Sequence, residues 1–299
     1  MNLDNNWYGQ TFILNLITKN KNKLIYGGYQ HGWISSINAT KTKPSLGERK
    51  FLKNLPFFCW NEKCFNNLKK VNKKKLNFFI IGSPFLYVDK ILSSKKVKEK
   101  NEILFFPANQ KIQDSLRSNH NNIINFLNKK KLKVNVCLFY KDFQNKKIHD
   151  LYKKNKIKLY CCGTRKNLYF YFKLYNLFKQ HKYIYFNSIC SGLFYSLFLK
   201  KKTLLFLNRK YSNYLYDFEK KDILYYKKYY KFLFKKKINI RKGFELAKSE
   251  LGFKHLRSKE KLNEILGFKS NIKQIVCKIY YFLSYIYFKL TNKLKFLDM

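Results

Sequence analysis

The sequence predicts an α/β protein with an open, mostly parallel sheet between about Glu102 and Phe206. Two observations lead to this fold class: short apolar runs of strand length recur along this stretch, and a helix-compatible stretch separates each run from the next. This alternation is the signature of βαβ units, whose strands lie parallel. Ligands of such sheets bind at the carboxyl ends of the strands. The five expected strands are Ile103–Phe106, Val134–Tyr140, Ile157–Cys162, Tyr183–Phe186 and Thr203–Leu207.

Helices are expected between these strands and over the last third of the chain. Ser258 is expected to cap one of them, because its hydroxyl can accept from an unpaired first-turn N–H group. Gly252 and Gly267 are expected just beyond helix ends. The expected helices are Lys111–Lys129, Lys146–Asn155, Asn167–Gln180, Ser191–Leu199, Tyr214–Lys235, Arg241–Gly252 and Ser258–Leu266.

The first hundred residues predict a second, smaller α/β domain. Three strand candidates, each followed by a polar or glycine-containing turn, are Leu24–Tyr29, Phe57–Trp60 and Phe78–Ile81. The charged stretch Ser93–Asn101 has few apolar residues and is the natural linker. We therefore expect a smaller α/β domain over 1–98, a Rossmann-like domain over 99–268 and an amphipathic C-terminal helix over 269–299.

The charge of the chain is strongly positive but does not point to nucleic acid as the main partner. The formal net charge is +46, and the basic residues are nearly all Lys and are spread along the whole chain. Proteins that bind the phosphates and bases of nucleic acids usually use Arg, which binds them with two parallel hydrogen bonds. Lys, Asn, Ile, Phe and Tyr are over-used together, as an AT-rich genome would produce at tolerant positions. An RNA- or ribosome-binding protein without catalysis stays open as an alternative.

The seven cysteines predict reduced thiols, since they form no C-x-x-C pair and lack histidines at zinc spacing. No metal site and no cofactor are expected. The start of the chain has neither the basic region nor the apolar run of a secretory signal, which predicts a cytoplasmic protein.

The C-terminal stretch Gln274–Phe296 mixes aromatic residues with lysines. This pattern fits a helix lying in the interface of an anionic membrane, on the inner face of the cell membrane. It fits equally a helix packed across the domains with its lysines in water. The lysines concerned are Lys278, Lys289, Lys293 and Lys295.

The strongest candidate site follows the fourth expected strand of the larger domain. The strand ends at Asn187 and Ser188, and a helix begins near Ser191 and Gly192. Small residues there let a phosphate approach backbone N–H groups and the positive end of the helix dipole. The alternative is an ordinary cap before a buried helix.

Two further groups of residues follow other strands. Gly163 and Arg165 lie in the loop after the third strand of the larger domain, where an Arg can neutralise a diphosphate or lie in solvent. His31 stands beside Gly32 after a strand of the smaller domain, where it can act as a general base or have a structural role. The chain contains no G-x-G-x-x-G, P-loop, G-x-S-x-G or H-E-x-x-H motif.

Several short motifs in a fixed order carry a family resemblance. QHGW, IIGSPFLYV, ILFFPAN, VNVCLFYKD, the stretch from YCCGTRKN to KKKTLLF, and GFELAKSELGF resemble bacterial proteins from O-antigen and capsule gene clusters. That family is related to GT-B glycosyltransferases and more distantly to CDP-glycerol glycerophosphotransferases. The resemblance covers roughly residues 24 to 268. The chain departs from the family at Pro107–Gln110, where a His-Ser pair is expected after Pro-Ala.

The resemblance implies two Rossmann-like domains facing a cleft, with a nucleotide-sugar donor mainly on the second domain and no obligatory metal. The leading hypothesis is a glycosyltransferase-like enzyme of surface polysaccharide synthesis, with a polysaccharide or lipid-linked acceptor. In it, His31 deprotonates the acceptor, and the helix at Ser191–Gly192, with Arg165 and Lys201, stabilises the departing diphosphate. The rivals are a CDP-alcohol phosphotransferase, which would use the same cleft, and a non-catalytic scaffold.

Overall fold

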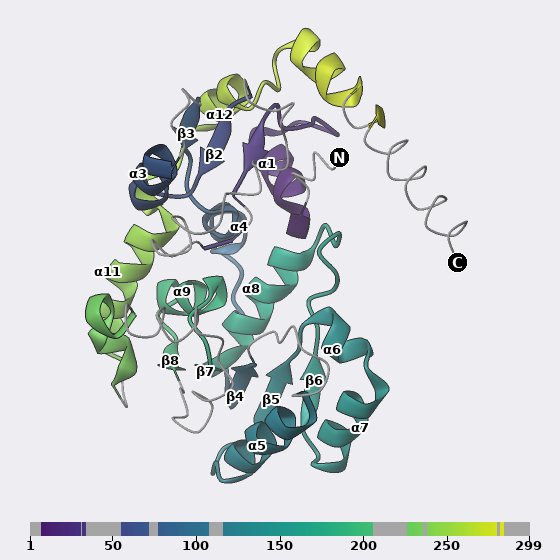
Figure 1. Cartoon of the computed structure of the whole chain (residues 1–299), viewed down its shortest axis with the longest axis vertical. Coiled ribbons are helices and arrows are strands. Elements are labelled where there is room, and N and C mark those ends of the chain that lie inside the picture. Colours follow the sequence, from purple (N-terminus) through teal and green to yellow (C-terminus); the bar gives the residue numbers. More distant parts are fainter. Residues whose placement is uncertain are drawn as a thin grey trace. The chain divides into compact units, whose positions relative to one another are not determined.

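The computed structural model describes residues 7–30, 32–33, 55–71, 77–107, 116–205, 226–235, 238–279 and 282–283 (Figure 1). The chain divides into two compact units. Unit 1 comprises residues 1–91 and 250–299, and unit 2 comprises residues 92–249. The predicted α/β class is confirmed, because each unit contains its own parallel sheet.

The division of the chain differs from the one that the sequence suggested. The first boundary falls at 91/92 instead of 98/99, and residues from Glu250 onward group with unit 1 instead of closing unit 2. Long-range backbone pairing explains the second difference: the N–H of Ser83 donates to the carbonyl of Leu251 at 2.8 Å, and the N–H of Tyr26 donates to that of Leu266 at 3.0 Å. Local sequence patterns carry no trace of such contacts.

Unit 2 is built on a five-stranded parallel sheet with the order β6-β5-β4-β7-β8. In chain order its strands read 3-2-1-4-5, the Rossmann arrangement, in which the connections leave in opposite directions from the central strand. The strands are β4 (Lys100–Phe106), β5 (Val134–Cys137), β6 (Lys158–Tyr160), β7 (His181–Phe186) and β8 (Lys202–Leu205).

The helices of unit 2 follow the strands as expected, with one addition. Residues 138–140, expected in a strand, lie beyond the end of β5, and α6 begins at Tyr140. It ends before Asn145, whose side chain caps the next helix by accepting from Lys147 N and Ile148 N. The helices are α5 (Leu116–Asn128), α6 (Tyr140–Gln144), α7 (Lys146–Lys154), α8 (Phe170–Gln180), α9 (Ser191–Phe198), the 3-10 helix η5 (Lys231–Phe234) and α11 (Ile240–Leu251), whose last two residues belong to unit 1.

The core of unit 2 surrounds β4, the central strand of its sheet. Ile103, Leu104 and Phe105 are all buried, as expected for a parallel strand covered on both faces. Phe105 packs in one cluster with Leu127 of α5 and Tyr152 of α7, so these two helices cover one face of the sheet (Figure 1). Burying such side chains stabilises a fold by roughly 1.5–3 kcal/mol each.

Unit 1 has a smaller sheet of three parallel strands, in the order β1-β2-β3. The strands are β1 (Gly28–Tyr29), β2 (Phe57–Cys59) and β3 (Phe78–Ile80). The helices are the 3-10 helix η1 (Trp7–Gly9), α1 (Gln10–Thr18), α3 (Glu62–Val71), α4 (Pro84–Leu92), the 3-10 helix η6 (Phe253–His255), α12 (Lys259–Ile265) and a helix over residues 271–279.

Three expected helix ends in the C-terminal part are confirmed. The Ser258 hydroxyl accepts from Lys261 N at 3.2 Å and caps α12, and Gly252 and Gly267 follow helices with φ of +73° and +74°. Within the described residues no helix has the length and apolarity needed to cross a bilayer. His31, Ala108–Gln110 and most of the expected helix Tyr214–Lys235 lie outside the described residues.

Candidate functional site

The candidate site of unit 2 lies at the carboxyl ends of β4 and β7. These two strands are neighbours, paired from Ile103 and Tyr183 to Phe106 and Phe186. The chain leaves β4 toward β5 on one side and leaves β7 toward β8 on the other, so the strand order reverses at this pair. Open parallel sheets bind ligands in the crevice formed at such a reversal.

Two stacked aromatic rings lie at the carboxyl ends of β4 and β7, where the candidate site is. Phe106 ends β4 and Phe186 ends β7, and their rings stack with centroids 5.2 Å apart at an interplanar angle of 14°. Phe178 of α8 meets the Phe106 ring edge-on at 5.2 Å. The last residues of both strands are thus held in place by packing, which gives the loops above them a rigid support.

The turn between β7 and α9 contains four of the residues that the sequence singled out. Asn187, Ser188, Ser191 and Gly192 are all half-buried, so they lie neither in the core nor fully in solvent. A Cβ atom added at Gly192 would lie 3.1 Å from the Phe186 ring, tighter than most real contacts. Glycine therefore lets the first turn of α9 settle directly on the Phe186 ring.

The electrostatics of this turn favour an anion. The first turn of α9 contains no acidic residue, so no carboxylate of that turn opposes the partial positive charge of the helix start. Burial raises the pKa of the Cys190 thiol, against the lowering effect of the Leu193 and Gly192 backbone N–H groups and of Ser188. Cys190 is therefore a neutral thiol at pH 7 and adds no negative charge.

The loop after β6 positions Gly163 and Arg165. Gly163 has φ of +95°, and Asn167 closes the loop by donating to the Cys162 carbonyl at 3.0 Å and accepting from Tyr169 N at 2.9 Å. Arg165 is exposed, and its guanidinium carbon lies 5.9 Å from the centroid of the Phe139 ring, just after β5.

The structure does not bring Arg165 to the β7–α9 turn. β6 is the edge strand, and β5 and β4 stand between it and β7. The Arg165 guanidinium lies near the end of β5, and the two strand spacings from β5 to β7 amount to about 10 Å. The idea that Arg165 and the start of α9 act on the same phosphates therefore needs revision, since the two groups lie over different parts of the sheet edge.

The structure places Lys201 away from the diphosphate position that the sequence hypothesis gave it. It immediately precedes β8 and so lies at the amino end of the sheet, opposite the ligand-binding edge. Its side chain is buried and donates to Glu99 Oε1 at 2.5 Å and to the Lys179 carbonyl at 3.1 Å. Lys201 joins α8, β8 and the segment before β4, away from the β7–α9 turn.

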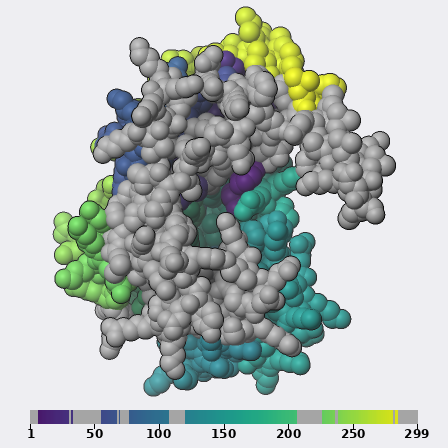
Figure 2. All heavy atoms as spheres, viewed as in Figure 1, coloured from purple at the N-terminus to yellow at the C-terminus, as the bar shows by residue number. Residues whose placement is uncertain are grey.

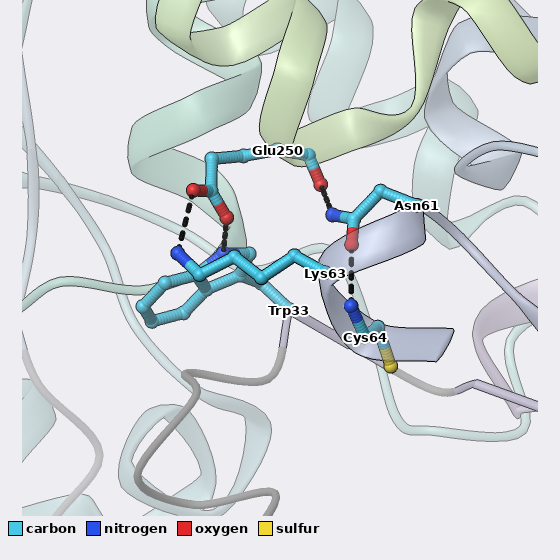
Figure 3. A network of polar contacts seen from close by, with 5 residues as sticks. All are labelled: Trp33, Asn61, Lys63, Cys64 and Glu250. Carbon is cyan, nitrogen blue, oxygen red and sulfur yellow. Dashed lines mark hydrogen bonds and ion pairs between the residues drawn. The ribbon is translucent and has the colours of Figure 1, made fainter. Parts of the chain in front are cut away.

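The carboxyl edge of the sheet in unit 1 is occupied by residues that the sequence did not suggest. Glu250 of α11 accepts from Trp33 Nε1 at 2.6 Å and pairs with Lys63 Nζ at 3.0 Å (Figure 3). The Glu250 carbonyl accepts from Asn61 Nδ2 at 2.5 Å, and Asn61 Oδ1 accepts from Cys64 N at 2.8 Å. We call Trp33, Asn61, Lys63, Cys64 and Glu250 the Glu250 network.

Gly252, two residues after Glu250, lies against the backbone just after β2. A Cβ atom at Gly252 would lie 1.7 Å from the carbonyl oxygen of Trp60, so only glycine fits. Trp60 itself receives the buried Gln30 side chain, whose Oε1 accepts from Trp60 N at 2.8 Å. The residue before His31 is thus locked to β2, although His31 itself is not among the described residues.

Among the residues that the structure describes, no group of three His, Cys, Asp or Glu side chains is placed to hold a metal ion.

Comparisons with known proteins add three solved structures. No protein-family model and no curated protein matches the chain. Staphylococcus aureus MnaA in its co-structure with UDP is 13% identical, with a TM-score of 0.41 over 92% of this chain and 78% of its own. UDP-GlcNAc 2-epimerase from Neisseria meningitidis, bound to UDP-GlcNAc, is 12% identical, with a TM-score of 0.39 over 91% of this chain and 80% of its own.

The third structure is a mutant of S. aureus TarM in complex with fondaparinux, alpha-GlcNAc-glycerol and UDP. It is 14% identical with a TM-score of 0.32, and the match covers 74% of this chain. This chain spans only 43% of the length of TarM.

Proposed function

We propose that this protein is a glycosyltransferase-like enzyme that binds a nucleotide-sugar donor at the β7–α9 turn of unit 2. The observation that carries the proposal is the coincidence of two features: the strand order reverses between β4 and β7, and a helix with small residues and no acid in its first turn begins at this point. This combination suits a diphosphate. The sugar and the GT-B type come from the sequence resemblance.

In this proposal the backbone of α9 provides the diphosphate contacts. Ser191 and Gly192 supply N–H groups at the helix start, and Asn187 and Ser188 supply short polar side chains beside them. These donors stabilise the negative charge that grows on the diphosphate as its bond to the sugar breaks, without a metal ion. Arg165, whose guanidinium lies near the end of β5, faces a more distant part of the donor.

The acceptor side follows the sequence hypothesis for His31. Its imidazole takes the proton of an acceptor hydroxyl while the hydroxyl oxygen forms a bond to the anomeric carbon and the diphosphate leaves. The acceptor is a growing surface polysaccharide or a lipid-linked saccharide. Replacing His31 by Ala is expected to abolish turnover and to leave the donor affinity unchanged, which isothermal titration with the donor would measure.

The direct test is thermal stability against a panel of nucleotides: UDP, GDP, CDP, CMP, TDP and ADP. A ligand that binds only the folded protein stabilises it by about 2.7 kcal/mol at 100 times its Kd. A rise in Tm with one nucleoside diphosphate other than CDP supports the proposal and identifies the donor class. A preference for CMP or CDP points to alcohol-phosphate transfer instead. If no nucleotide raises the Tm, the proposed nucleotide site is wrong.

A pair of variants at Ser191 ties the shift to the backbone of α9. Ser191 is the first helical residue and Cys190 before it is extended, with φ −147° and ψ 174°, so Ser191→Pro is tolerated there. Ser191→Pro removes one N–H donor and is expected to abolish the nucleotide shift. Ser191→Ala keeps that donor and is expected to retain the shift. Equal shifts in both variants would show that the nucleotide binds elsewhere.

A further inference from the structure

The helix over residues 271–279 is fixed to unit 1 by one of its faces. The Gln274 side chain accepts from Leu24 N at 2.9 Å and donates to the carbonyls of Leu24 at 2.8 Å and Gly267 at 3.1 Å. Cys277 is buried one turn later, with its thiol 3.7 Å from the Ile25 carbonyl. These contacts leave only the opposite face of the helix available for anything else.

That opposite face is apolar and exposed. Ile272, Ile275 and Ile279 are 76%, 56% and 53% exposed, and Phe282 and Leu283 are 64% and 55% exposed. At 3.6 residues per turn, Ile272, Ile275 and Ile279 fall within an arc of about 60°. Figure 2 shows this C-terminal part, in yellow, on the outside of the molecule. Grouped apolar side chains in water mark an interaction surface rather than scattered surface residues.

Lysines border this stripe on both sides. Lys273 and Lys278 fall between the apolar stripe and the inner face, one on each margin, at the same helical periodicity. Lys273 is half-buried, with its ammonium 5.3 Å from the Tyr26 ring centroid, while Lys278 is exposed. From residue 269 onward the chain has six lysines and a single acidic residue, Asp298. The charge around the stripe is therefore positive.

We propose that the stripe Ile272–Ile275–Ile279, extended by Phe282 and Leu283, docks on an anionic lipid bilayer. Apolar side chains at the centre of one face with lysines at its margins suit the boundary between acyl chains and negatively charged headgroups. A second copy of the chain fits less well, because pairing two such stripes would bring together the lysines of two chains that each carry a net charge of +46. The surface belongs to unit 1, and the inference does not rest on the proposed activity.

The test is co-sedimentation of the full chain with vesicles of phosphatidylcholine alone and of phosphatidylcholine with phosphatidylglycerol. Binding is expected to the mixed vesicles, to weaken steeply between low salt and 0.5 M salt, and to be much weaker on phosphatidylcholine alone. The triple variant Ile272→Ser, Ile275→Ser, Ile279→Ser is expected to reduce the partition coefficient at least about tenfold. Lys273→Gln with Lys278→Gln is expected to lower it by a smaller factor, on the mixed vesicles only.

A matched control replaces three exposed apolar residues elsewhere. Leu16, Ile240 and Phe253 are 44%, 42% and 41% exposed, and their triple Ser variant is expected to bind like the parent chain. Ile275→Trp gives a second readout that does not depend on loss of binding: its emission should shift to the blue when mixed vesicles are added and be quenched by brominated lipid. The proposal is overturned if the parent chain does not bind the vesicles. It is also overturned if the Ile272, Ile275 and Ile279 variant binds them as well as the parent chain does. A parent dimer that this variant converts to a monomer overturns it too.

Discussion

The two units of this protein treat the carboxyl edge of a parallel sheet in different ways. In unit 1 the chain's own residues occupy that edge: Glu250 binds Trp33 and Lys63, and Gly252 lies against the Trp60 carbonyl. In unit 2 the edge at β4 and β7 ends in the half-buried turn before α9, with no acid in the first turn of that helix. The same sheet geometry thus supports structure in one unit and, in our proposal, a ligand in the other.

This difference makes the two edges separable by experiment. Variants at the edge of unit 1 should change the free energy of unfolding and leave the nucleotide shift in place. Variants at the edge of unit 2 should change the nucleotide shift and leave the free energy of unfolding nearly unchanged.

The largest effect is expected from Gly252→Ala. Its Cβ atom would lie 1.7 Å from the Trp60 carbonyl oxygen at a φ of +73°, so backbone must move. We expect a loss of about 4 kcal/mol or more in the free energy of unfolding, measured with urea. Gly267→Ala is the control, since it shares the positive φ but meets Tyr26 Cβ at 2.8 Å instead of a backbone oxygen at 1.7 Å; it should cost less, about 2 kcal/mol.

Acid should destabilise the interior of unit 2. Burial lowers the pKa of His120 to about 4, and its Nδ1 lies 2.9 Å from the Tyr152 hydroxyl. The unfolded chain, with a histidine pKa of about 6.5, binds more protons between these values, so stability falls as the pH drops from 6.5 to 4. The loss from His120 approaches about 3 kcal/mol at 1.36 kcal/mol per pKa unit.

His120→Gln is the control for the acid effect, because it keeps a polar partner for Tyr152 and does not titrate. Urea unfolding of both proteins from pH 7.5 to 4 should give a steeper decline for the parent. Parallel pH profiles would show that His120 is not the titrating group.

Replacing Glu250 by Ala should have a smaller effect on stability. The change leaves Trp33 Nε1 without its acceptor and Lys63 without its carboxylate; the Lys63 side chain is 36% exposed and water can solvate it. A loss of about 2 kcal/mol is expected from the unsatisfied indole N–H. Lys63→Gln should cost less, and the nucleotide shift should persist in both. Its disappearance in Glu250→Ala would break the separation of the two edges.

The smallest effect is expected from Arg165→Ala. This side chain is exposed and its guanidinium lies near the Phe139 ring, so the free energy of unfolding should change by less than about 0.5 kcal/mol. The nucleotide shift should fall partially, in contrast to its loss in Ser191→Pro. Lys166→Ala, one residue away and also exposed, is the control for the loss of one positive charge. A complete loss of the shift in Arg165→Ala would bring Arg165 back to the diphosphate.

Local patterns in the sequence predicted the strands of both units, but not the C-terminal residues that complete unit 1. The apolar runs at Ile103 and Tyr183 predicted β4 and β7 because central parallel strands are buried on both faces. The place of Asn187 to Gly192 after β7 followed from the same pattern. Strand order does not follow from it, and so Arg165 was expected beside that turn.

The missed residues depend on contacts between distant parts of the chain. Nothing near Glu250 in the sequence indicates that Trp33 and Lys63 bind it, since those residues stand about two hundred positions earlier. Lys201 was assigned to the donor because it is basic and near α9, but it precedes β8, and the start of a parallel strand lies at the opposite edge from its end.

The arrangement of unit 1 has a consequence for synthesis of the protein. Unit 2 is a continuous stretch of chain, so it can fold as soon as residue 249 has left the ribosome. The three short strands of unit 1 are made much earlier but lack Glu250, Gly252 and Gln274, which complete their surroundings. The first part of the chain therefore completes its contacts only after the last part has been translated.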